Sequence, residues 1–316
     1  MTERVPMTKG ASPWQFEWFR PPAGGRLRYG RVKADQGCRG TLVLFMGRCE
    51  YLQKYNELAS DWLARGFQVF ALEWRGQGLS DRFLANREKC HVPDYDVHSR
   101  DLEAWLDAVV TPAETGPTLM FAHSMGGLIG LRALAALPDR FAAAVVSAPM
   151  VAIDTGWIPA GGARLLARSA WGLGYEDRYA VGQGDYDPAV DTVFKDNKLT
   201  SDPERFRRIH QGYLDNPDLR LGGVTFGWLI ASFRAQEALV LAQVLGGVKT
   251  PVLLVSPDAD TLVPPAVVRK VGGMLPDCTL VEVPGSRHDP LHERDELRQP
   301  IWGKIDRFLE RFVKAN

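Results

Sequence analysis

The sequence predicts an α/β fold in which a mostly parallel central sheet is flanked by helices on both faces. Short apolar runs rich in β-branched and aromatic residues recur along the chain, and segments with helical spacing lie between them. A stretch from about residue 150 to residue 245 interrupts this alternation. Strands that alternate with helices favour a parallel sheet, because parallel neighbours need a crossover connection, which is usually helical.

Six of the apolar runs are expected to be strands that are buried on both faces. They are residues 40–46, 67–73, 117–123, 142–149, 251–257 and 278–285. Near the start of the chain, residues 16–20 and 27–32 instead alternate with a period of two. Such alternation is typical of antiparallel strands with one exposed face, so we expect an antiparallel pair at the edge of the sheet.

The helical periodicity predicts helices at residues 51–65, 95–110, 125–137 and 301–313. The core domain is therefore expected to comprise residues 1–149 and 246–316, with residues 150–245 inserted between two strands. The first half of the insertion is rich in Gly and Trp, and the second half has helical spacing. We interpret the insertion as a mainly helical cap, or lid, over the carboxyl edge of the sheet; the alternative is a helical domain with no role at the site.

Composition and charge exclude several classes of protein. The 316 residues are 45% hydrophobic and 24% charged, with 38 Lys+Arg balancing 38 Asp+Glu. This is the composition of an ordinary globular protein, and it provides no net field to attract nucleic acid. The Gly-rich pieces lack the spacing of nucleotide-binding loops, so we expect no cofactor, no metal and no nucleic-acid partner.

The four cysteines and the N-terminus bear on the cellular location. Cys38, Cys49, Cys90 and Cys278 lie far apart, without the paired spacing of zinc sites or disulfide frameworks, so free thiols are expected. The first ten residues lack the pattern of a signal peptide, and no window approaches about 18 uninterrupted apolar residues. We expect a cytoplasmic protein, with transient contact to a membrane surface as a further hypothesis.

A serine stands where an expected strand passes into an expected helix, in the segment LMFAHSMGGLIG at residues 119–130. Ser124 lies between the small residues Ala122 and Gly126, which is the pattern of a nucleophile elbow. Ala122 replaces the usual first glycine, and we expect a slightly wider turn to accommodate its methyl group. The alternative is an ordinary helix start.

A serine nucleophile needs a base, which a histidine can supply. His288 follows the last apolar run, where a loop could carry it to Ser124. The alternative is His292, which we expect at the start of the following helix. His123 is expected to point to the opposite side of the turn and to be a buried, hydrogen-bonded residue behind it.

The base in turn needs a carboxylate that fixes its tautomer. Asp258 and Asp260 both follow the run at residues 251–257. We choose Asp260, because the Thr-Leu-Val-Pro that follows it would anchor the loop by burial, whereas Asp258 lies at a turn after a proline. The order Ser124, Asp260, His288 is the order expected when each residue follows a different parallel strand at one sheet edge.

The oxyanion formed during acyl transfer needs two amide donors. One is expected to be the amide of Met125, at the start of the helix after Ser124. The other is expected in the loop after residues 40–46, at Gly47 or Arg48, and we favour the amide of Arg48. The Arg48 side chain could bind substrate or pair with Glu50, and the sequence leaves this open.

These motifs resemble the α/β-hydrolase superfamily, and within it the bacterial lysophospholipase and monoacylglycerol lipase group. The resemblance rests on FMGRCEYLQKYNELASDWLARGFQVFALEWRGQGLSDR, FAHSMGG, NKLTSDPERF, TFGWL, LLVSPDADTLVP and PGSRHDPLHERDELR, and it spans most of the chain beyond residue 42. It implies the α/β-hydrolase fold, the three catalytic roles above and an oxyanion loop at Gly47 and Arg48. Pro257 departs from the family pattern, as Ala122 does, but neither change removes a catalytic group.

The resemblance and the hydrophobic cap together predict a serine hydrolase that cleaves esters of monoacyl lipids, either lysophospholipids or monoacylglycerols. The alternatives are a small-ester carboxylesterase or peptidase of the same fold, and a non-catalytic protein that binds acyl ligands. The small-molecule acyl ester is the expected partner, and the oligomeric state and head-group preference stay open. We expect WRGQGLSD at residues 74–81 to be a structural turn in which Ser80 and Asp81 bond to backbone.

Two further segments carry weaker expectations. The basic segment RFRRIH at residues 205–210 is expected to be a solvated surface, with contact to an anionic lipid head group as the alternative. The insertion is rich in large apolar side chains, and some of them are expected to line an acyl-chain pocket while others form its own core. Examples are Trp157, Trp171, Phe226 and Trp228.

Overall fold

A computed structural model describes residues 12–34, 37–156 and 158–313 of the chain. Its centre is an eight-stranded sheet with the order β1-β2-β4-β3-β5-β6-β7-β8. The strands are β1 Gln15–Phe19, β2 Leu27–Val32, β3 Gly40–Phe45, β4 Phe67–Leu72, β5 Thr118–His123, β6 Ala143–Ser147, β7 Val252–Pro257 and β8 Cys278–Val283. The two pairings that involve β2 are antiparallel, and the others are parallel.

The strand predictions are confirmed in position, including the antiparallel edge pair formed by β1 and β2. The expected burial on both faces is wrong for β8, because β8 lies at the other edge of the sheet and only Val281 and Val283 are buried in it. Every residue of β3 to β7 is buried, as expected for apolar runs covered on both faces. The strand β1 lies at one edge of the sheet, and all of its residues are exposed or half-buried. The predicted α/β-hydrolase architecture is therefore the architecture of the protein.

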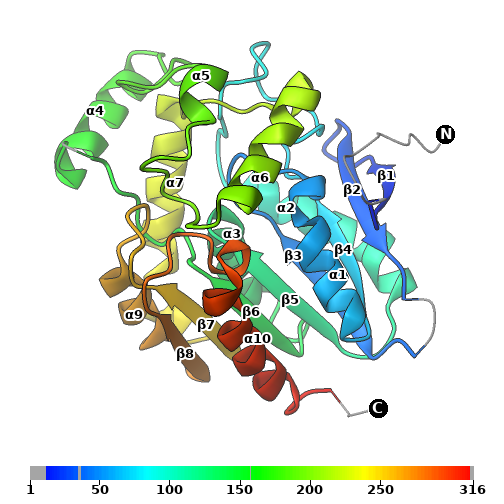
Figure 1. The fold of residues 1–316 in the computed structure, drawn as a ribbon. Coiled ribbons are helices and arrows are strands. Elements are labelled where there is room, and N and C mark those ends of the chain that lie inside the picture. Colours follow the sequence, from blue (N-terminus) through cyan, green and yellow to red (C-terminus); the bar gives the residue numbers. More distant parts are fainter. Residues whose placement is uncertain (1–11, 35–36, 157, 314–316) are drawn as a thin grey trace.

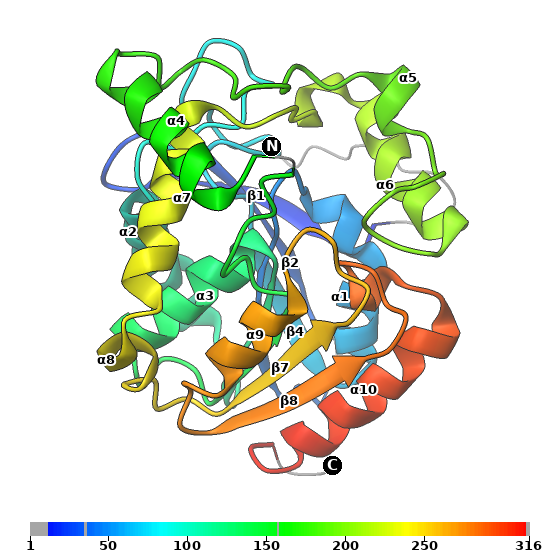
Figure 2. The same ribbon diagram turned by 90° about the vertical axis from the view of Figure 1, so that its left-hand side faces the viewer.

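Helices cover both faces of the sheet (Figure 2). On one face lie α1 Asn56–Ala64 and α10 Asp295–Leu309, whose Trp62 and Trp302 rings pack edge to face in the core there. On the other face, α2 Asp96–Trp105, α3 Met125–Ala136 and α9 Pro265–Gly272 contribute to a second core. Short one-turn helices are η1 Leu52–Tyr55, η2 Leu106–Val110, η3 Thr111–Ala113 and η5 Pro290–His292.

The predicted helices exist, but one of them is shifted along the chain and one further helix was not predicted. The helix α10 begins at Asp295 instead of residue 301, because Pro300 lies inside it and does not break it. The helix α9 was not predicted, since its few apolar positions form too short a pattern to be distinguished from a loop.

The chain between β6 and β7 forms the upper part of the molecule in Figure 1. Its helices are α4 Ala160–Gly172, α5 Pro188–Asp191, α6 Pro203–Asp215, η4 Pro217–Leu219, α7 Phe226–Leu239 and α8 Ala242–Leu245. Helices thus occur in both halves of the insertion. Trp228, Ala231 and Leu239 of α7 belong to the same core as α3, so α7 also serves as the crossover between two parallel strands. The boundaries of a cap at residues 150 and 245 stay a prediction.

Three further features that the sequence analysis addressed are the turn at residues 74–81, the cysteines and possible membrane-spanning helices. Ser80 Oγ donates to the Glu73 carbonyl at 2.6 Å, and the Arg26 amide donates to Asp81 at 2.7 Å, which confirms WRGQGLSD as a backbone-bonded turn. All four cysteines are free thiols. No helix in the described part of the chain is long and apolar enough to cross a bilayer.

Candidate active site

Ser124 occupies a strained turn between β5 and α3. Its backbone has φ 52° and ψ −117°, which lies outside the regions that L-residues favour. Three backbone hydrogen bonds hold it there. The Ser124 amide donates to Ser147 O at 3.0 Å, and the amides of Met150 and Leu128 donate to Ser124 O at 2.9 and 3.1 Å. Strain that neighbouring structure enforces is typical of a nucleophile elbow, so the local geometry agrees with the motif.

The glycines after Ser124 permit the close approach of α3 to the sheet. A Cβ on Gly126 would lie 2.3 Å from the Phe45 carbonyl oxygen, and one on Gly127 would lie 2.8 Å from Pro149 Cα. The Ala122 methyl group is accommodated farther along the helix, where a Cβ on Gly130 would come within 3.1 Å of it. Because residue 130 is a glycine, the Ala122 methyl group has the space that we expected a wider turn to provide.

The structure brings Ser124, His288 and Asp260 together. His288 Nε2 lies 2.8 Å from Ser124 Oγ, and His288 Nδ1 lies 2.7 Å from Asp260 Oδ2. Asp260 Oδ1 also accepts the amides of Leu262 and Val263, at 2.7 and 3.0 Å. Burial on its own raises the pKa of Asp260, but the bonds and charge of His288 and the two amides outweigh it and lower the net pKa. An ionised Asp260 requires Nδ1 to carry the proton, which leaves Nε2 free to accept from Ser124.

The two alternative residues lie elsewhere. Asp258 is exposed, and its carboxylate accepts the Gly285 amide at 2.6 Å. His292 is buried, with Nδ1 3.0 Å from Asp289 and Nε2 3.3 Å from the Lys54 carbonyl. These positions support the choice of Asp260 and His288.

The loop after β3 lies beside Ser124. The Gly47 amide donates to the Glu50 carboxylate, so it is already used. Met125 is the first residue of α3, where backbone amides lack intrahelical acceptors. The Arg48 guanidinium donates to Cys49 Sγ at 2.9 Å and to Gly222 O at 3.2 Å, and it makes no ion pair with Glu50. The geometry therefore leaves the amides of Arg48 and Met125 as the candidate oxyanion donors.

A buried charge cluster beside His288 was not predicted from the sequence. The Lys54 ammonium pairs with the Glu50 carboxylate and lies 2.6 Å from Asp289 Oδ2. Burial on its own raises the pKa of both acids. Lys54 outweighs this effect at Glu50, and His292 and Lys54 outweigh it at Asp289, so the net pKa of each acid lies below its usual value. The cluster links the loop after β3, through Glu50, to the residue that follows His288.

His123 belongs to this cluster, which corrects the expectation that it points to the opposite side of the turn. Its ring centroid lies 5.0 Å from that of His288, and Nε2 lies 3.8 Å from Glu50 and 3.9 Å from Asp289. Its Nδ1 has no hydrogen-bond partner among the described residues. Burial lowers the pKa of His123 to about 4, so the ring is neutral at physiological pH.

Three of these groups could in principle hold a metal ion. Glu50, His123 and Asp289 each offer a ligand atom within 4.8 Å of the others. The positive charge between the two carboxylates is already supplied by Lys54. We therefore assign the cluster an electrostatic role and not a metal-binding one.

A cavity of about 490 Å³ opens above Ser124 and His288. Its walls are largely apolar and come mostly from the chain between β6 and β7. They include Met150, Ile153, Ile158, Leu166, Phe226, Trp228 and Leu229. Phe226 and Trp228 thus lie where an acyl-chain pocket was expected, whereas Trp171 does not line this cavity and Trp157 lies outside the described residues.

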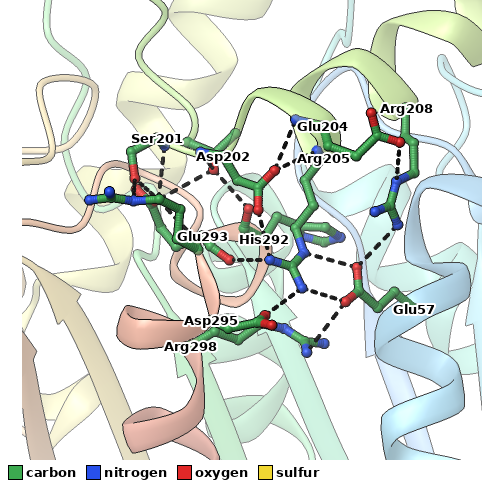
Figure 3. A network of polar contacts seen from close by, with 12 residues as sticks. Glu57, Ser201, Asp202, Glu204, Arg205, Arg208, His292, Glu293, Asp295 and Arg298 are labelled. Carbon is green, nitrogen blue, oxygen red and sulfur yellow. Dashed lines mark hydrogen bonds and ion pairs between the residues drawn. The ribbon is translucent and has the colours of Figure 1, made fainter.

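The basic segment at residues 205–210 is more than a solvated surface, which corrects that expectation. Arg205 is buried, and it makes ion pairs with Glu57 at 2.6 Å, Asp202 at 2.9 Å and Asp295 at 2.7 Å (Figure 3). Arg208, by contrast, is exposed. The Arg205 network ties α6 to α1 and to the start of α10, so it fixes the position of α6 above the sheet.

A family model described as serine aminopeptidase, S33, matches residues 36–295. The chain belongs to this hydrolase family. It is 31% identical to lysophospholipase L2 from Escherichia coli over 299 residues, which cover 90% of this chain and 84% of that protein. It is 27% identical to a monoacylglycerol lipase from Mycolicibacterium smegmatis, over 88% of this chain and 91% of that one.

A solved structure supports the fold of this hydrolase. A soluble variant of the monoglyceride lipase from Saccharomyces cerevisiae superposes with a TM-score of 0.75 and 18% identity, and the alignment covers 100% of both chains. The predicted membership of the α/β-hydrolases is confirmed, and the protein is an enzyme of the hydrolase class.

Proposed function

We propose that this hydrolase cleaves the carboxylic ester of a monoacyl lipid through Ser124, His288 and Asp260. The observation that carries the proposal is the hydrogen-bonded chain of these three side chains at the base of an apolar cavity. Each group has the polarity that its role requires: an ionised acid, a base whose Nε2 accepts, and a hydroxyl that donates.

In the first step His288 Nε2 takes the proton of Ser124 as its oxygen attacks the ester carbonyl carbon. The carbonyl oxygen becomes an oxyanion, held by the amides of Met125 and Arg48 in our assignment. Asp260 stabilises the imidazolium through Nδ1. Loss of one amide donor would raise the barrier by about 3 kcal/mol.

The tetrahedral intermediate then collapses. The bond between the carbonyl carbon and the alcohol oxygen breaks, and His288 gives its proton to the leaving alcohol. A water molecule, deprotonated by His288, attacks the acyl group on Ser124 and releases the fatty acid. The proton returns to Ser124, and the enzyme is regenerated.

The choice of a monoacyl lipid rests on the cavity and on the relatives. The apolar walls above Ser124 provide a surface that an alkyl chain can bury, at roughly 25 cal/mol for each Å² removed from water. Relatives over most of the chain are named a lysophospholipase and a monoacylglycerol lipase. Both reactions release one fatty acid from one ester.

A peptidase is the second candidate, because the family description names a serine aminopeptidase. The same three residues could cleave an amide. An aminopeptidase would have to recognise a free amino terminus next to the scissile bond, whereas the walls of the cavity above Ser124 are mainly apolar. Aminoacyl p-nitroanilides therefore serve as the comparison substrates.

The proposal is tested with p-nitrophenyl esters of increasing acyl length. We expect kcat/KM to rise from acetate to medium-length or longer chains, and to vanish in Ser124→Ala. An optimum at acetate, or faster cleavage of aminoacyl p-nitroanilides than of any ester, would contradict the monoacyl-lipid assignment.

A further inference from the structure

A second cavity, of about 460 Å³, lies beside the one above Ser124. Arg48, Gly182 and Gln183 line both cavities, so they mark the boundary between them. Suppose that a substrate binds with its ester at Ser124 and its acyl chain in the first cavity. Its alcohol part then needs a separate binding space, and the second cavity adjoins the first.

Charged residues of both signs line the second cavity. Arg48 borders it on the side of Ser124 and has no carboxylate within ion-pair distance in the described part of the chain. Lys54 is already paired with two carboxylates, Glu50 and Asp289, and is not available to an anion. Arg48 is therefore the cation on this side that can pair with an anionic group.

Three acids border the cavity from the segment around α5. Asp185, Asp187 and Asp191 make no ion pair with Lys or Arg among the residues described. This segment can attract a cation, so unpaired charges of both signs line the same cavity.

The wall supplied by α6 also has unused hydrogen-bonding capacity. His210 lines the cavity and is only 9% exposed. Its Nδ1 lies 3.0 Å from the Tyr186 hydroxyl, while its Nε2 is buried without a partner in the described structure. Buried polar atoms usually have partners, so an unpartnered one beside a cavity is consistent with a ligand that supplies the contact.

Aromatic rings complete the wall. The Tyr186 and Tyr213 centroids lie 5.3 Å apart, and the Arg220 guanidinium carbon lies 5.6 Å from the Tyr186 centroid. A cation is therefore already tolerated next to this ring. The Arg205 network keeps α6, which carries His210 and Tyr213, fixed relative to the sheet (Figure 3).

We propose that the second cavity binds the head group of a zwitterionic lysophospholipid, with Arg48 at the phosphate and Asp187 and Asp191 at the ammonium. This proposal rests on the function proposed above and narrows its substrate class. A monoacylglycerol has no charge to place in the cavity. A lysophosphatidic acid would place a phosphate at Arg48 but leave the acids without a counterion.

The first test compares four substrates with the same acyl chain, kept below their aggregation limits. They are lysophosphatidylcholine, lysophosphatidylethanolamine, lysophosphatidic acid and monoacylglycerol. We expect the two zwitterionic substrates to have the highest kcat/KM. Equal or lower values for them than for monoacylglycerol would overturn the proposal.

The second test removes the two negative charges with Asp187→Asn/Asp191→Asn. Asn retains the oxygens that accept the Ala189 and Asp187 amides, so the local turn is preserved. We expect kcat/KM for the zwitterionic substrates to fall about tenfold, as for loss of a charged contact, while monoacylglycerol is unaffected. Asp107→Asn/Asp139→Asn is the matched control, because both acids are exposed and line neither cavity.

A binding measurement distinguishes the head-group proposal from the proposed catalytic function. In Ser124→Ala, calorimetry with glycerophosphocholine is expected to detect binding that is weakened by Asp187→Asn/Asp191→Asn, with glycerol as the comparison. Absence of such binding, or an equal effect of the variant on all four substrates, would overturn the head-group assignment. Binding without hydrolysis of any ester by the wild-type protein would support it and instead contradict the proposed function.

Discussion

At the scale of single residues, the candidate site depends on which of two nearby acids and which of two nearby histidines reach Ser124. Asp260 is buried and accepts three hydrogen bonds, whereas Asp258 is exposed. His288 contacts Ser124, whereas His292 is held by Asp289. Each pair provides matched substitutions within one loop, after β7 for the acids and after β8 for the histidines.

Asp260→Asn is expected to lower kcat by about 10⁴-fold, because an amide in this position favours the wrong tautomer of His288. The substitution keeps the shape of the side chain, so circular dichroism should be unchanged. Hydrolysis of a medium-chain p-nitrophenyl ester measures the loss. Asp258→Asn is the control and should retain near wild-type kcat; a similar loss in both variants would contradict the assigned roles.

At the scale of elements, two contacts bring the loops around Ser124 together. The glycines at the start of α3 let this helix approach the end of β3. The Lys54 ammonium joins η1 to the loop after β8 through Asp289. Each contact can be tested separately from catalysis.

Gly126→Ala is expected to destabilise the protein by about 3 kcal/mol or more, since its Cβ would lie 2.3 Å from the Phe45 carbonyl and backbone must shift. Gly161→Ala in α4 is the control. Its Cβ would meet nothing within 4 Å, so the change should be neutral or stabilise by up to about 1 kcal/mol. Urea unfolding measures both, and equal unfolding free energies for the two variants would contradict this account of the elbow.

Lys54→Met is expected to cost about 3 kcal/mol of stability, because it leaves two buried carboxylates without their counterion. Lys270→Met removes an exposed ammonium and should change stability by less than about 0.5 kcal/mol. Chemical denaturation at neutral pH distinguishes the two. A loss below about 1 kcal/mol for Lys54→Met would mean that the cluster does not hold the loops together.

At the scale of the whole molecule, buried histidines make stability depend on pH. Burial lowers the pKa of His123 to about 4 and that of His98 to about 3, against an unfolded value near 6.5. The unfolded chain therefore binds more protons than the folded one below about pH 6.5. Stability is fully present above this pH and is lost as the pH falls toward the folded pKa values.

We expect these two histidines together to lower the free energy of unfolding by about 3 kcal/mol between pH 6.5 and pH 5, since each can contribute at most about 1.36 kcal/mol per pH unit. Urea unfolding across this range measures the slope. His98→Gln should reduce the slope relative to wild type. A flat profile would contradict the neutral, buried state of these rings.

The sequence predicted the sheet and the positions of the three candidate site residues well, because both depend on local patterns. Apolar runs marked the strands, and Ser124, Asp260 and His288 each follow one of them. The cluster of Glu50, Lys54 and Asp289 could not be predicted in this way. Charged residues in a sequence are usually exposed, and these are buried only because two loops that are far apart in the chain converge.

The space for Ala122 and the burial of Arg205 were missed for the same reason. Ala122 fits because residue 130 is a glycine on the facing helix, and Arg205 is buried because acids from α1 and α10 meet it. These contacts join different elements, so they cannot be predicted from the residue pattern within one segment.

Labelling with a fluorophosphonate probe tests the central claim most directly, because the probe reacts with an activated serine and requires no knowledge of the substrate. Peptide mass spectrometry of the folded protein should find the label on Ser124. Labelling should be lost in Ser124→Ala and strongly slowed in His288→Ala. A folded protein whose Ser124 stays unlabelled, or a His288→Ala variant that labels as fast as wild type, would contradict the claim that His288 activates Ser124.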